Sequence, residues 1–211
     1  LPSDIDVIGL QPPGLDGSCD PVGSIQELAT VFLREILERG GDSHPKMTIA
    51  GHSFGGLVAY QIACDAERRG EPLSGVSIID SASPDLHVPL GNDWSQAEWV
   101  VHMSSIASLM FQEDVDVHLS EIDRLPDEEQ LSFFFERLLA KKIMAEGTDI
   151  AFIAGLVGVY RSNLMAKQTI DRLPHGTIPL RVIRSESEQP SHLLEERTRK
   201  NREQEDLGWA R

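Results

Sequence analysis

The sequence predicts an α/β protein with a doubly wound, mostly parallel sheet and an inserted helical lid. Short apolar runs alternate with amphipathic helical stretches over the first 80 residues. This alternation stops over residues 93–171, where only helical periodicity is found, and a strand-like run returns at residues 178–184. Strands that alternate with helices are typical of a parallel sheet, because each parallel connection needs a crossover.

The first elements follow in order along the chain. An apolar run at residues 5–10 predicts a strand. Ser24 and Glu27 have the spacing of a capping box, which predicts a helix that begins at Ile25 and closes at Gly40 and Gly41. The apolar residues 47–50 predict a buried strand. Helical spacing over residues 57–66, closed by Gly70, predicts the next helix, and residues 76–80 predict the strand after it.

The helical insertion contains three apolar stripes, at residues 99–110, 131–139 and 150–165. Because it lies between two sheet strands, we interpret it as a lid over a site at the end of the sheet. Its Phe and Met residues favour helix packing over the wall of a substrate channel. Gly155 and Gly158 allow either a close helix contact or a mobile segment, and both alternatives stay open.

A glycine-serine turn at residues 51–55 is the main chemical signal. Gly51, Ser53 and Gly55 form the pattern G-x-S-x-G, with an apolar run before it and a helical stripe after it. In this context the pattern predicts a nucleophile elbow, which lifts a serine hydroxyl above the sheet. Ser53 is therefore the candidate nucleophile, and the backbone N–H of Phe54 is a candidate oxyanion donor. The alternative is a glycine-rich turn with a structural role only.

Composition limits the classes of function. The 211 residues can form one α/β domain with an inserted cap, and the net charge of −15 argues against nucleic acid and anionic membranes as partners. There is no membrane-spanning apolar run and no signal peptide, and the two cysteines, Cys19 and Cys64, fit a reducing cytoplasm. Without metal-ligand spacing or a phosphate-binding glycine loop, we expect no metal and no bound cofactor.

Several stretches together resemble the thioesterase domains at the end of nonribosomal peptide synthetase and polyketide synthase assembly lines, members of the α/β-hydrolase superfamily. The block G-H-S-F-G-G followed by a strand that ends I-D-S is more specific than G-x-S-x-G alone. The matching stretches occur in the order of the family: residues 7–17, 24–29, 50–60, 71–73, 78–81, 159–164 and 207–209.

The resemblance implies acyl transfer from the phosphopantetheine arm of an acyl or peptidyl carrier protein. Ser53 would form an acyl-enzyme, and water or an internal nucleophile would release an acid or a macrocycle. Asp80 matches the acid of the family, and the carboxyl ends of parallel strands meet in one crevice. The competing acids are Glu186 and Glu188, which follow the strand at residues 178–183. Asp80 could instead serve as a helix N-cap or a turn residue.

The sequence departs from the family at both ends. The histidine that acts as general base in the family follows a Gly-Trp pair, but this chain stops at Arg211, two residues after Trp209. We therefore expect a domain over residues 1–211 that is truncated at both ends, with its base beyond Arg211 and the first oxyanion loop before Leu1. His192 is the least unlikely substitute for the base. The remaining histidines do not fit the pattern: His44, His52, His87, His102, His118 and His175.

Two other functions stay open at this stage. The chain could be a serine esterase or lipase that acts on oxygen esters, or a non-catalytic relative that only docks a carrier protein.

Overall fold

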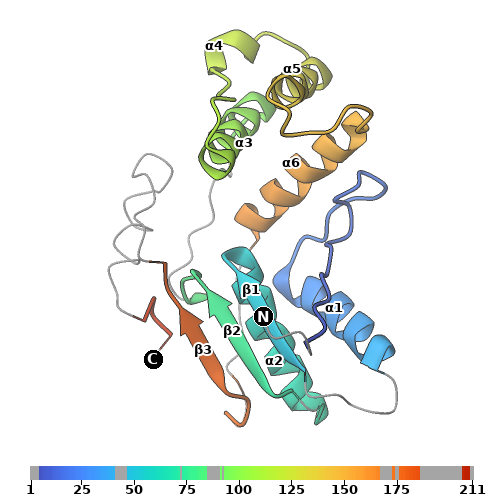
Figure 1. Ribbon diagram of the computed structural model, residues 1–211, viewed down its shortest axis with the longest axis vertical. Helices are drawn as coiled ribbons and strands as arrows, with labels where there is room; N and C mark the ends of the chain where they lie inside the picture. The colour runs from blue at the N-terminus through green and yellow to red at the C-terminus, as the bar shows by residue number, and fades with distance from the viewer. Residues whose placement is uncertain are drawn as a thin grey trace.

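The computed structural model describes residues 5–40, 47–71, 73–84, 91, 93–166, 173, 176–185 and 206–209. Its centre is a three-stranded sheet of β1 (Thr48–His52), β2 (Gly75–Ile79) and β3 (Leu180–Ile183). Both neighbouring pairs are parallel. Figure 1 shows this sheet below a separate block of helices, and the predicted α/β class with a parallel sheet is confirmed.

Two long helices accompany the sheet. α1 (Ile25–Gly40) begins where predicted: Glu27 N donates to Ser24 Oγ at 3.2 Å, and Ser24 Oγ donates to Glu27 Oε2 at 3.0 Å. α2 (Phe54–Arg69) ends at Gly70, whose left-handed conformation and N–H bonds to Ala66 and Glu67 carbonyls form the C-cap. The two helices share a core of buried residues: Ile25, Leu28, Ala29, Phe32, Leu33, Leu57, Val58, Ile62 and Ala66.

The sheet is covered by α2 on one of its faces. Val76 and Ile78 of β2 are buried in one cluster with Ala59 and Ala63 of α2. On β1, Thr48, Ala50 and His52 are exposed while the residues between them are partly buried. The prediction of a fully buried strand at residues 47–50 was therefore wrong. Alternate side chains point to opposite faces of a strand, and helix packing buries only one of them here.

The strand predicted at residues 5–10 was also wrong, since these residues form no strand. Val7 and Ile8 are 72% and 60% exposed, and Leu10 packs against the core of α1 and α2. A strand needs a neighbour that accepts and donates its backbone hydrogen bonds. Among the described residues, β1 pairs only with β2, so the segment at residues 5–10 has no ladder to join.

The helical block consists of α3 (Gln96–Phe111), α4 (Leu119–Ile122), α5 (Asp127–Ala140) and α6 (Ile150–Met165). The three predicted helices are present, and the single turn α4 was not predicted. Met103 and Phe134 are buried inside the block, as expected for packing residues, whereas Met110 and Phe111 are exposed. The block has its own core: Ala97, Trp99, Val100, Met103, Ala107, Val115, Val117, Ile122, Phe134, Leu138, Ile153 and Val157.

α6 packs directly on the loop that precedes α1. A Cβ at Gly155 would lie 2.5 Å from the carbonyl oxygen of Leu15 and 2.6 Å from the backbone nitrogen of Gly17. One helical turn further on, a Cβ at Gly158 would be in ordinary contact with Pro21, and Ser162 Oγ donates to the carbonyl of Val22 at 2.9 Å. At Gly155 the structure shows a close contact, made with this loop rather than with another helix, whereas Gly158 has room for a side chain (Figure 1).

Candidate active site

Ser53 lies in the tight turn between β1 and α2. Its backbone has φ 52° and ψ −124°, a conformation that is strained for any residue with a side chain. Its N–H donates to the carbonyl of Ile79 at 2.9 Å, which ties the turn to the end of β2. The residue is exposed, and its side chain does not cap α2. The turn thus presents the Ser53 hydroxyl to solvent above the sheet.

Two glycines make this turn possible. A Cβ at Gly51 would lie 2.7 Å from Gly56 N and closer still to the carbonyl of Gly55. A Cβ at Gly56 would lie 2.7 Å from the Cβ of Ser81. By contrast, a Cβ at Gly55 would meet nothing within 4 Å. The pattern G-x-S-x-G emphasised Gly51 and Gly55, but the packing requires glycine at Gly51 and Gly56.

Phe54 is the first residue of α2. The first N–H groups of a helix have no partner four residues earlier within the helix, and the helix dipole adds partial positive charge at this end. The N–H of Phe54 is therefore placed where it can donate to an oxygen that gains negative charge beside Ser53.

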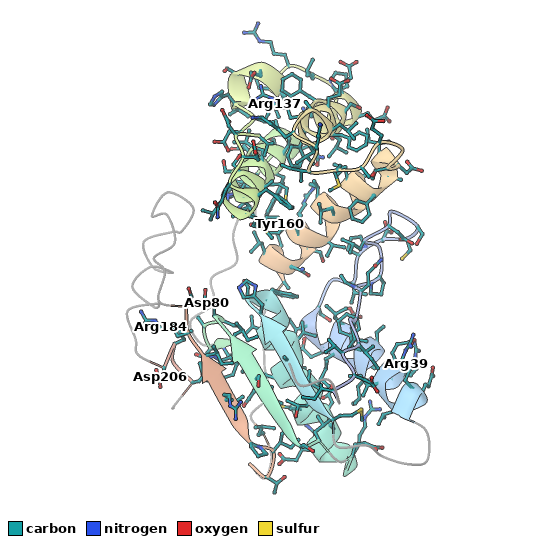
Figure 2. The ribbon with its side chains drawn as sticks, in the orientation of Figure 1. Arg39, Asp80, Arg137, Tyr160, Arg184 and Asp206 are labelled. Carbon is teal, nitrogen blue, oxygen red and sulfur yellow. The ribbon has the colours of Figure 1, made fainter. Side chains whose placement is uncertain are left out.

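Asp80 lies next to Ser53 because of the register of the sheet. His52 pairs with Ile79 at the end of β1 and β2, and Ser53 and Asp80 are the residues that follow this pair. Neighbouring strands lie about 4.8 Å apart, which sets the scale of the separation between the two backbones. Asp80 is 7% exposed and follows β2 at its end nearest the helical block (Figure 2).

The backbone of Asp80 is held in an unusual conformation. Its φ is 49°, and its N–H donates to the carbonyl of Ile183 at 2.7 Å. Its Oδ1 accepts a long hydrogen bond, of 3.4 Å, from the N–H of Ser185. Figure 2 shows Arg184 beside Asp80, at the end of β3. Asp80 is thus neither a helix N-cap nor a surface turn residue, but a buried carboxylate at the carboxyl ends of β2 and β3.

A turn at residues 206–209 packs against the chain that follows Asp80. Trp209 Nε1 donates to the carbonyl of Ser81 at 2.7 Å, and Ser83 N donates to the carbonyl of Leu207 at 2.8 Å. Leu207 is fully buried, and the Trp209 ring contacts Tyr60 of α2 at 4.8 Å between centroids. Sequence reasoning noted Leu207, Gly208 and Trp209 only as part of a resemblance and missed this contact.

Three of the histidines lie among the described residues. His52 is exposed and follows the same strand alternation as Ala50. His102 lies in the helical block between the rings of Trp94 and Tyr160, at 5.0 and 5.8 Å, and burial lowers its pKa. Burial also raises the pKa of Tyr160 to about 12. His118 is exposed at the start of α4.

The remaining candidates lie outside the described residues. These are His44, His87, His175 and His192, with Glu186 and Glu188 as the competing acids. The choice of acid and the identity of the general base stay predictions.

Within the part of the chain that the structure describes, no group of His, Cys, Asp or Glu side chains could hold a metal ion. No described helix combines the length and the apolar character needed to cross a membrane. Two surface hollows of about 600 and 480 Å³ lie along α1 and the loop before it, and neither is lined by Ser53 or Asp80.

Comparison with known proteins matches the first three quarters of the chain to one family. A family model described as "Thioesterase domain" covers residues 1–151. Orsellinic acid synthase armB of Armillaria mellea is 38% identical over 74 residues, which are 35% of this chain and 3% of that protein. Nonribosomal peptide synthetase btyA of Aspergillus terreus is 26% identical over 143 residues, which are 66% of this chain and 15% of that protein. The chain thus spans a small share of these relatives.

Solved structures show the same fold. The chain superposes with a TM-score of 0.71 on holo-AB3403, a four-domain nonribosomal peptide synthetase, at 19% identity over 95% of this chain and 14% of that chain. The Vlm2 thioesterase domain gives a TM-score of 0.53 at 22% identity, over 85% of this chain and 64% of that chain.

Proposed function

Because this chain belongs to the thioesterase-domain family, a family of enzymes, we propose that it releases an acyl or peptidyl chain from a carrier protein through an ester on Ser53. One observation carries the proposal: the exposed, strained serine turn follows β1, and the buried Asp80 follows the neighbouring strand β2. A serine held in this way is a typical nucleophile of the α/β-hydrolase fold.

The proposed reaction has two halves. The Ser53 oxygen attacks the thioester carbonyl, the C–S bond breaks, and the thiol of the phosphopantetheine arm leaves with a proton. The Phe54 N–H donates to the carbonyl oxygen as it becomes negative. Water or a nucleophile within the bound chain then attacks the ester, and Ser53 regains its proton as an acid or a macrocycle is released.

Asp80 is proposed to hold the general base. The base accepts the Ser53 proton, and a buried carboxylate fixes its orientation and stabilises its charged form. In this proposal the base is a histidine. The placement of Asp80 at the end of the strand beside Ser53 supports the proposal, because an imidazole between the two residues could contact both.

The helical block is proposed to act as a lid, over residues 93–171 of a single domain at residues 1–211. It lies above the carboxyl ends of β1 and β2 in Figure 1, and Ser53 and Asp80 are the residues that follow these two strands. A lid that excludes water lengthens the life of the acyl-enzyme and favours attack by an internal nucleophile. The proposed partner is an acyl or peptidyl carrier protein, since the relatives above are named as an orsellinic acid synthase and a nonribosomal peptide synthetase.

The test is intact-mass spectrometry after the purified protein is mixed with a short acyl thioester. We expect an acyl adduct on the wild-type protein and none on Ser53→Ala, with both variants folded by circular dichroism. An adduct that persists on Ser53→Ala, or a wild-type protein without any adduct, would contradict the proposal. The same measurement with the matching oxygen ester tests the alternative that the protein is an esterase. That alternative requires the oxygen ester to acylate Ser53 faster than the thioester does.

A further inference from the structure

Trp209 has no role in the proposed reaction, yet it is bonded to the residue that follows the proposed acid. We infer that Trp209 is a positioning residue for Asp80, which it fixes through the hydrogen bond from its Nε1 to the carbonyl of Ser81. This inference rests on the proposed function, in which Asp80 orients the general base.

Hydrogen bonds and a buried side chain hold the 206–209 turn against residues 81 and 83. The 206–209 turn is closed by the Trp209 N–H, which donates to the carbonyl of Asp206 at 3.1 Å, while Gly208 N donates to Asp206 Oδ1 at 2.9 Å. Leu207 anchors the turn, since its side chain is fully buried. Two hydrogen bonds then join the turn to residues 81 and 83, one in each direction.

Asp80 needs such support because its backbone is strained. A residue other than glycine at φ 49° stays there only where its surroundings leave no alternative. On its N-terminal side, the Asp80 N–H is bonded to the carbonyl of Ile183. On its C-terminal side, the described contact that fixes the peptide of Ser81 is the bond from Trp209. The bond to Ile183 and the bond from Trp209 thus fix the backbone on both sides of Asp80.

The same contact reaches the serine turn. Ser81 is buried and packs so closely on Gly56 that a Cβ there would lie 2.7 Å from the Ser81 Cβ. Gly56 in turn donates its N–H to the carbonyl of Ser53 at 2.9 Å. A shift of Ser81 would therefore disturb both the carboxylate of Asp80 and the first turn of α2. Trp209 acts on the reaction through these neighbours rather than by touching the substrate.

The Trp209→Phe variant tests this role, because it keeps a ring against Tyr60 but removes the N–H donor. Tyr60→Phe is the matched control: it changes the same ring contact and instead removes the hydroxyl that accepts from Leu173 N. The first measurement is the hydrogen-exchange rate of the Asp80 amide. We expect faster exchange in Trp209→Phe and an unchanged rate in Tyr60→Phe.

The second measurement is the rate of Ser53 acylation by the short thioester, in the wild-type background and with Asp80→Asn. We expect Trp209→Phe to lower the rate about 10- to 100-fold, as a misplacement of roughly 1 Å can do. In the Asp80→Asn background it should cause no further loss, because both changes remove the same function. Tyr60→Phe should stay close to the wild-type rate in both backgrounds.

Two outcomes overturn the inference: an unchanged exchange rate of the Asp80 amide in Trp209→Phe, or an equal loss of acylation with and without Asp80→Asn. A wild-type protein that is not acylated at all refutes the proposed function instead. The exchange rate then decides alone whether Trp209 fixes Asp80, since it does not depend on any activity.

Discussion

Replacing Gly51 with alanine would place a methyl group where the backbone of the serine turn already lies. The new Cβ would be 2.7 Å from Gly56 N and closer still to the carbonyl of Gly55, whereas ordinary van der Waals contacts begin at 3.4 Å. Relief of this overlap requires the turn to move by about 1 Å or more, and neither neighbour is a flexible side chain that could give way.

The size of the effect follows from that displacement. Overpacking of a well-packed site costs about 1–3 kcal/mol. For a domain of this size we therefore expect Gly51→Ala to lower Tm by about 2–12 °C, at roughly 2–4 °C per kcal/mol. Ser53 moves with the turn, and a shift of about 1 Å can lower the acylation rate about 100-fold.

Gly55→Ala is the matched control within the same pattern. Its Cβ would meet nothing within 4 Å, and Gly55 is the second residue of α2. Alanine is favoured over glycine in a helix by up to about 1 kcal/mol, so this variant should keep its activity and be as stable as the wild type or slightly more stable. Thermal unfolding followed by circular dichroism and the acylation rate by intact mass measure both variants. Equal losses in Gly51→Ala and Gly55→Ala would refute the steric argument.

Three further predictions concern the acid, the helical block and its pH dependence. Asp80→Asn should lower thioester turnover by up to about 10⁴-fold while Glu186→Gln retains it. Turnover that is lost only in Glu186→Gln would make the glutamate the acid. Gly155→Ala should push α6 off the preceding loop and lower Tm by several degrees, unlike Gly158→Ala, whose Cβ has room; equal melting curves would contradict this. Burial lowers the His102 pKa below 6.5, so the unfolded chain takes up the proton first as the pH falls. The free energy of unfolding is therefore fully retained above pH 6.5 and decreases as the pH drops through the lowered pKa. His102→Phe should reduce this loss of stability at low pH. If Tm changes equally between pH 7.5 and 5.5 in the wild type and in His102→Phe, the prediction is refuted.

The elements that were predicted correctly from the sequence are those that local residue patterns specify. The N-cap at Ser24, the left-handed Gly70 and the serine turn all depend on residues within a few positions of one another. The long helices of the block are specified by apolar stripes of three or four turns, whereas α4 is a single turn and too short to leave a periodic pattern.

The features that sequence reasoning missed depend on distant parts of the chain. Residues 5–10 have the composition of a strand, but a strand also requires a partner, and composition does not report one. The half-exposed face of β1 follows from which face the helices cover. The local sequence was enough to predict Asp80 as the candidate acid. Its strained backbone and the hydrogen bond from Trp209 to Ser81, which are 128 residues apart, become visible only in the folded structure.

The contact between α6 and the preceding loop has a consequence for how such an enzyme can diversify. Around Gly155 the nearest atoms are the backbone of residues 14–17, so little side-chain variation is available at this junction. α6 also meets this loop at Ala151, which lies against Gly17, and at Ser162, which bonds Val22. Tyr160 instead lies beside the rings of Trp99 and His102 inside the block. Substitutions at positions such as Tyr160 can reshape the interior of the block while α6 keeps its place relative to the sheet. Selection for a new acyl chain can therefore act on the block without moving the serine and the carboxylate beneath it.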